Sequence, residues 1–198
     1  MSRTTEVREP MEKLHAAHGA LKQVSGEYET VGFTSHEPEL IAAARKKFWS
    51  AYRRLFDEYL EPLDARFRGG DEQALDEVID FLATDVPAFR CGYLKEKWLR
   101  KLKSTSLTQA QQQRLKHAAL SLCADSHYRR EIAEWNRLMI KLADKETVIE
   151  LFGLMESANS FIKSKARHML YGILQNRNDI IQPDYLRTTL LFHVQDEQ

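Results

Sequence analysis

Histidines and carboxylates at helical spacing are the first side chains in this 198-residue chain that could do chemistry. Glu12 and His15 form an E-x-x-H pattern, and His15 and His18 form an H-x-x-H pattern. Residues three apart on a helix share a face, so two of these side chains could bind one metal ion. A carboxylate-bridged dimetal site needs a second E-x-x-H, which the sequence lacks. We therefore expect no metal site, and histidines that lie on the surface or on an amphipathic helix.

Two thiols, Cys91 and Cys123, are the candidate nucleophiles. A reactive thiol needs a nearby histidine and an accessible, electropositive setting. His117 and His127 are near Cys123 in sequence, but a predicted turn separates His127 from it. Both cysteines fall on apolar helical faces, which is typical of small buried side chains. Gly69-Gly70 lacks the Lys-Ser/Thr that would complete a phosphate-binding loop. We expect no catalytic residues, no cofactor and no small-molecule substrate.

Charge is distributed unevenly along a chain whose formal net charge is zero. The segment 56–86 holds ten acidic residues against two arginines, and the segment 90–117 holds eight Lys/Arg against one glutamate. The basic segment 90–117 could bind phosphates, it could be a solvated face, or it could pair with the acidic segment 56–86 of the same or another molecule. The candidate binding residues for a partner or a nucleic acid are Arg90, Lys95, Lys97, Arg100, Lys101, Lys103, Arg114, Lys116, Lys163, Lys165 and Arg167.

The composition limits the compartment and the class of protein. Two cysteines give no disulfide framework and favour a reducing compartment. The polar start of the sequence does not resemble a signal peptide, and no stretch approaches the 18 or so apolar residues that span a bilayer. We expect a cytoplasmic protein without a membrane partner.

Apolar residues at spacings of three and four predict helices along most of the chain. A long helix is predicted over 38–60 and is ended or kinked by Pro62, and 68–71 is predicted as a loop in which Asp71 caps the next helix. Thr108 is predicted to cap another helix. The remaining predicted helices are 72–82, 88–102, 128–142, 146–155 and 161–174, and a short element over 185–194 follows Pro183.

Large apolar residues recur with a period of 34 to 37. Trp98 is followed by Trp135 after 37 residues, and Met169 follows after 34. Short amphipathic helix pairs cannot bury their apolar stripes alone, and stacking them makes a continuous core. The interpretation is a helical-repeat domain over 37–198, after an N-terminal region of 1–36, with the helix 38–60 as a cap. The repeat units are approximately 71–103, 107–143 and 145–175, and the C-terminal element is 183–194.

The segment Phe161–Leu170 (FIKSKARHML) resembles the second helix of a HEAT or armadillo repeat. This resemblance covers approximately residues 71–174 and implies an all-α solenoid of stacked antiparallel helix pairs. Such repeats are scaffolds with many functions, so no activity follows from the resemblance. The alternative is a helical bundle without a repeat.

Three functional classes remain open from the sequence. The first is a non-catalytic adaptor, or a subunit of a larger assembly, that docks a protein partner through charged and apolar faces. The second is a nucleic-acid-binding protein that uses the segments 90–117 and 163–167, with a repair-like groove in which Glu134 and Trp135 are the nearest candidates. The third is a self-assembling protein whose acidic and basic faces meet. Trp49, Trp98 and Trp135 are predicted to lie in the core.

Overall fold

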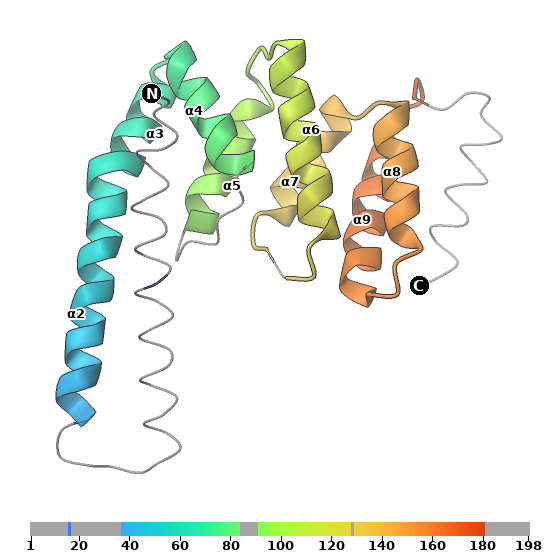
Figure 1. Ribbon diagram of the computed structural model, residues 1–198. Helices are drawn as coiled ribbons and strands as arrows, with labels where there is room; N and C mark the ends of the chain where they lie inside the picture. Colours follow the sequence, from blue (N-terminus) through green and yellow to red (C-terminus); the bar gives the residue numbers. More distant parts are fainter. Residues whose placement is uncertain (1–15, 17–36, 84–90, 128, 181–198) are drawn as a thin grey trace. The chain divides into compact units, whose positions relative to one another are not determined.

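Every regular element in the described part of the chain is a helix, which confirms the predicted all-α class for those residues (Figure 1). The computed structural model describes residues 16, 37–83, 91–127 and 129–180. The elements are α2 (Glu37–Leu55), η1 (Phe56–Leu60), α3 (Glu61–Arg68), α4 (Glu72–Ala83), α5 (Cys91–Leu102), α6 (Gln109–Ala124), α7 (Ile132–Leu142), α8 (Lys145–Met155) and α9 (Ser160–Asn176).

The chain divides into two compact units near residue 82. The described part of the first unit comprises residue 16, 37–81 and Cys91, and that of the second comprises 82–83, 92–127 and 129–180. Apart from residue 16, the N-terminal region 1–36 lies outside the described residues, and so do the C-terminal element 183–194 and residues 88–90 of the predicted helix 88–102. None of the described helices is long and apolar enough to cross a membrane.

The sequence predicted that Pro62 ends or kinks the helix of 38–60. The helix does not end there, because helical structure continues through η1 and α3 to Arg68. A proline cannot donate an amide hydrogen bond, and its ring crowds the carbonyl four residues earlier. The helix widens into the π-turn η1 just before it, where the Glu61 amide donates to the Phe56 carbonyl. Pro62 then lies in the first turn of α3, where a missing amide hydrogen costs little.

The loop between α3 and α4 lies where the sequence predicted it, and Gly70 and Asp71 determine its conformation. Gly70 has φ +87°, a conformation that side chains with a Cβ rarely adopt. Asp71 accepts hydrogen bonds from the amides of Gln73 and Ala74, which confirms it as the cap of α4. Arg66 donates to Asp71 at 2.8 Å and to Glu77 at 3.1 Å, and so ties α3 to α4.

The start of α7 was predicted wrongly. Thr108 caps α6 as expected, and its side chain and that of Gln111 form a reciprocal capping box. However, α7 begins at Ile132 and not at Tyr128, which itself lies outside the described residues. Asp125 at the end of α6 accepts from the His127 amide at 3.1 Å and from the Arg129 guanidinium at 2.9 Å. These bonds hold the chain in a turn, so the helix starts later.

The core of the second unit is built from the positions that the period aligned. Trp98, Trp135 and Met169 are at most 1% exposed. Helix α6 contacts α7, α8 and α9, and α9 contacts α7 and α8. Figure 1 shows α6 and α8 side by side, with α7 and α9 behind them. The prediction of core tryptophans is confirmed for Trp98 and Trp135 and is wrong for Trp49, which is 36% exposed.

Candidate functional site

The buried carboxylate of Glu134 on α7 gathers three cations from two helices. Arg100 on α5 donates to it at 2.9 Å, Lys103 at 3.2 Å, and Arg137 one turn further along α7 at 2.6 Å. The Glu134 side chain is 5% exposed, whereas those of Arg100 and Arg137 are 56% and 61% exposed. The cations therefore cover the carboxylate and present their outer sides to solvent.

A second group of contacts joins the N-terminal ends of the same helices. Glu96 on α5 pairs with Arg130 at 2.9 Å and with Arg100 at 3.2 Å. The Arg130 guanidinium lies 3.9 Å from the centre of the Tyr93 ring, a cation–π contact. Arg130 is thus held from two sides, although half of its side chain remains exposed.

The C-terminal ends are joined by Lys141 of α7, whose amine donates to the carbonyls of Lys103 and Thr105. These carbonyls follow the last turn of α5, where a cation is favourable. Contacts thus run in the same order along both helices, so α5 and α7 are parallel neighbours. We call the cations on this surface the α5–α7 basic face: Lys97, Arg100, Lys103, Arg130, Arg137 and Lys141.

The electrostatics of the α5–α7 basic face follow from its buried anion. Burial alone would raise the pKa of Glu134, but hydrogen bonds from Arg100 and Lys103 outweigh it and leave that pKa below its ordinary value. Glu134 is therefore an anion at neutral pH, and it offsets one of the three charges gathered around it. The face keeps an excess of positive charge in fixed positions, which suits the binding of an anionic group.

The structure brings only some of the predicted binding residues together. Lys97, Arg100 and Lys103 lie on the α5–α7 basic face, and Lys101 is half-buried beside it on α5. Lys95 is buried in an ion pair with Glu131 at 3.5 Å. Because its side chain is only 4% exposed, Lys95 cannot take part in an exposed basic ridge.

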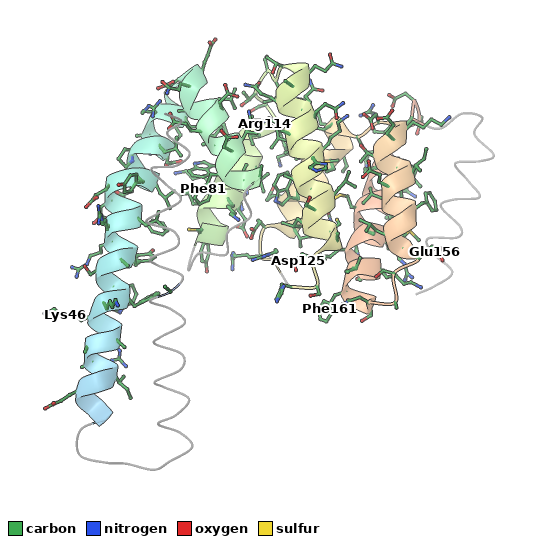
Figure 2. All side chains as sticks on the ribbon, viewed as in Figure 1. Lys46, Phe81, Arg114, Asp125, Glu156 and Phe161 are labelled. Atoms are coloured by element: carbon green, nitrogen blue, oxygen red, sulfur yellow. The ribbon has the colours of Figure 1, made fainter. Side chains whose placement is uncertain are left out.

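The remaining predicted residues are dispersed. Arg90 lies outside the described residues, and Lys163 and Arg167 on α9 are half-buried. Lys165 donates to the carbonyls of Leu122, Asp125 and His127, at the C-terminal end of α6, where Figure 2 labels Asp125. Its role is therefore to tie α9 to the end of α6.

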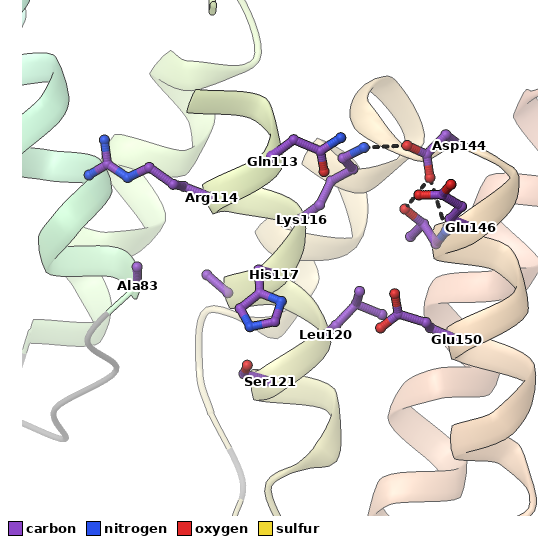
Figure 3. Close-up of a pocket in the computed structure, with 12 residues that line it drawn as sticks. Ala83, Gln113, Arg114, Lys116, His117, Leu120, Ser121, Asp144, Glu146 and Glu150 are labelled. Atoms are coloured by element: carbon purple, nitrogen blue, oxygen red, sulfur yellow. Dashed lines mark hydrogen bonds and ion pairs between the residues drawn. The ribbon is translucent and has the colours of Figure 1, made fainter. Parts of the chain in front are cut away.

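Lys116 and Arg114 border an open groove of about 450 Å³ along α6 and α8. The buried amine of Lys116 pairs with Asp144, which caps α8 by accepting from the Thr147 amide (Figure 3). Figure 3 shows Arg114 pointing from α6 toward Ala83, away from α8, while Glu146 and Glu150 lie on the α8 side. The groove is lined by two cations and three carboxylates, so its net charge is small and the α5–α7 basic face is the more strongly charged surface.

Three residues of the α5–α7 basic face were missed from the sequence, namely Arg130, Arg137 and Lys141. The 37-residue period contained a signal for one of them, because it aligns Arg137 with Arg100. A basic and aromatic stripe on α2, with Arg45, Trp49 and Arg53 at intervals of four, was also missed. The sequence feature that could have revealed this stripe is the stretch 41–56, which contains no acidic residue.

The candidate catalytic groups do not assemble into a site within the described residues. Burial raises the pKa of the Cys123 thiol to about 12, and Cys91 is also buried. The described residues contain no cluster of three His, Cys, Asp or Glu side chains that could hold a metal ion, and the pattern Glu12–His18 lies outside them. Trp135 is 1% exposed, so the suggested repair-like groove beside Glu134 is wrong because this ring cannot stack on a base.

Comparison of the chain with models of known families, with curated proteins and with solved structures finds no match. The function must therefore be argued from the geometry alone.

Proposed function

We propose that this protein is a non-catalytic, HEAT-like helical-repeat adaptor that docks an acidic segment of a protein partner on the α5–α7 basic face. The repeat part of the proposal is supported by the parallel alignment of α5 with α7. Residues Arg100 and Arg137, 37 positions apart, flank the same carboxylate. Neighbouring repeat units of a solenoid bring equivalent helices side by side in this way.

The observation that carries the proposal is the fixed arrangement of guanidinium groups around Glu134 and Glu96. A flexible arginine loses side-chain entropy when it binds a ligand, typically about 0.5–1.5 kcal/mol per ordered side chain. Arg100, Arg130 and Arg137 are already held by ion pairs at 2.6 to 2.9 Å, so part of this ordering is complete before a partner arrives. Guanidinium groups match carboxylates in shape, because both are planar and can form two parallel hydrogen bonds.

An acidic protein segment fits this surface better than a nucleic-acid duplex does. The chain carries no net charge, so it attracts a duplex little at long range, and any binding of nucleic acid depends on local charge together with an accessible ring for stacking. On this face the exposed aromatic ring, Tyr93, lies against Arg130, where it supports the guanidinium. A short acidic segment needs only local complementarity, which the face provides.

The test uses a fluorescein-labelled decaglutamate peptide and fluorescence anisotropy at low and at physiological ionic strength. The full chain should bind the peptide, and the affinity should fall with salt because exposed charges are screened. The variant Lys97→Gln, Arg130→Gln, Arg137→Gln leaves Arg100 and Lys103 on Glu134 and should weaken binding about tenfold or more at low salt, which corresponds to about 1.4 kcal/mol.

The control is Lys47→Gln, Arg54→Gln, Lys145→Gln, which removes the same charge from scattered exposed sites and should bind like the wild type. Equal loss of affinity in both variants would show that only net charge matters and would overturn the proposed site. A molar mass that rises at low salt, measured by light scattering, would favour self-assembly in place of an adaptor.

A further inference from the structure

Helix α2 carries a basic and aromatic stripe that the proposed adaptor function does not use. Arg45, Trp49 and Arg53 lie four residues apart, so they follow one line along the helix, with Lys46 beside them. These residues and Ala42 line a shallow hollow along the surface. Figure 2 labels Lys46 on this helix. The stripe spans about 12 Å, from the 1.5 Å rise per residue of an α-helix.

The stripe flanks the buried side of α2, because Trp49 follows Phe48 by one residue, about 100° around the helix. Phe48 and Leu55 are 3% and 0% exposed and mark the side that packs into the first unit. Trp49 is instead 36% exposed, on the side that carries the cations. About a third of the Trp49 side chain is therefore accessible, and it lies between exposed cations.

The Trp49 ring is held in place by its neighbours. Its centroid lies 5.3 Å from that of Phe48 and 5.4 Å from that of Tyr52, and both contacts are edge-to-face. Arg53 donates to the Trp49 carbonyl at 3.4 Å. The ring is thus positioned before any ligand binds, and a ligand that stacks on it meets a surface that is already ordered.

We infer that this stripe, formed by Arg45, Lys46, Trp49 and Arg53, is a binding site for single-stranded nucleic acid. Exposed cations along a line can neutralise successive phosphates, and an aromatic ring between them offers a platform for a base. The stripe carries three cations, Arg45, Lys46 and Arg53, and the stretch 41–56 around it has no acidic residue, so the local charge is complementary to a phosphate backbone. This site belongs to the first unit and is independent of the acidic-segment site in the second.

The experiment is an anisotropy titration of the full chain with a labelled 20-residue oligothymidylate at two salt concentrations. The affinity of the wild type should fall with salt. The variant Arg45→Gln, Arg53→Gln should reduce the slope of log affinity against log salt by about 1.4, because each phosphate contact on a single strand contributes about 0.7. The variant Lys47→Gln, Arg54→Gln removes the same charge from other sides of the helix and should leave the slope near that of the wild type.

The stacking step has its own test. Trp49→Ala should weaken binding about tenfold, within the range measured for loss of one stacked base. Trp49→Phe keeps an aromatic ring and should retain most of the affinity, which separates stacking from a general effect on folding. An abasic phosphodiester of the same length should bind the wild type and Trp49→Ala with similar, weaker affinity.

Intrinsic fluorescence gives a second readout. Trp98 and Trp135 are buried, so quenching by the oligomer should come from Trp49 and be absent in Trp49→Phe. The inference is overturned by an absence of binding at low salt, by equal affinity for the abasic oligomer and the oligothymidylate, or by binding that depends on Lys97, Arg130 and Arg137 and not on α2.

Discussion

The guanidinium of Arg100 on α5 donates a 2.9 Å hydrogen bond to the buried carboxylate of Glu134 on α7, which lies 34 residues further along the chain. This contact shows how the basic segment of the sequence is used. Part of its charge joins α5 to α7, and the exposed remainder faces solvent. Lys95, by contrast, is buried and forms an ion pair with Glu131.

The first prediction concerns the anchor of this contact. Glu134→Gln should lower the free energy of unfolding by about 1–3 kcal/mol, because the amide replaces an anion that accepts from Arg100, Lys103 and Arg137. Water can hydrate the three cations in the variant, so the loss of stability should be smaller than for a fully buried ion pair. Urea titration followed by circular dichroism measures it. Glu146→Gln, the same change at an exposed site of α8, should alter the stability by less than about 0.5 kcal/mol.

The second prediction concerns pH and Asp144. Burial by itself would raise the pKa of Asp144, but hydrogen bonds from Lys116 and Thr147 lower it from 3.8 to about 2. Because the folded-state pKa is the lower one, the ionised carboxylate contributes stability that is fully present above pH 4 and is lost as pH falls toward 2. Asp144→Asn preserves a good helix cap and removes the charge. The variant should be less stable than the wild type by about 1 kcal/mol at pH 6, a figure reduced for solvent screening.

Urea titrations of both proteins at pH 2.5, 3, 4 and 6 measure this difference. The difference in the free energy of unfolding between wild type and Asp144→Asn should become smaller below pH 4. Asp57→Asn removes an exposed negative charge and controls for net charge. A gap that is constant across this range would contradict an electrostatic role for the Lys116 pair.

The third prediction concerns two glycines, of which one has a backbone conformation that disfavours alanine and the other does not. Gly70 has φ +87°, so Gly70→Ala should destabilise the protein by about 1–2 kcal/mol. Gly153 is inside α8, and a Cβ built there meets no atom within 4 Å. Gly153→Ala should therefore stabilise the protein by about 0.5–1 kcal/mol, because alanine favours the helix. Thermal unfolding of the two variants measures the effects, and melting temperatures that move in the same direction would refute the prediction.

The fourth prediction concerns the thiols. Cys91 and Cys123 are 1% and 0% exposed, and burial raises the pKa of Cys123 to about 12. A thiolate is the reactive form, so Ellman's reagent should modify neither cysteine rapidly in the folded protein and both in urea. Rapid reaction of a thiol at pH 7.5 without denaturant would show that the surrounding helices open readily, and single Cys→Ala variants would identify which one.

Local sequence determined the helices and most of their ends. Thr108 and Asp71 were identified as caps because their side chains bond to amides two or three residues away, so the information is contained in a few neighbouring residues. The apolar period likewise placed Trp98 and Trp135 in the core. The end of the helix at Pro62, one of the two predicted alternatives, is not observed, because the sequence does not reveal that a π-turn precedes this proline. Trp49 was placed in the core because its position was assigned to an apolar stripe, whereas the ring lies at the edge of the buried side.

The sequence by itself thus determined the helices of the described residues, the spacing of the large apolar side chains in their core and the location of the basic segment. Only the tertiary structure decided which cations are exposed. Lys95 and Arg100 are five residues apart on one helix, yet the first is buried against Glu131 and the second presents most of its side chain to solvent. The physical reason is that a cation's availability depends on the carboxylates that other helices bring to it, and those partners are more than 30 residues away in the chain.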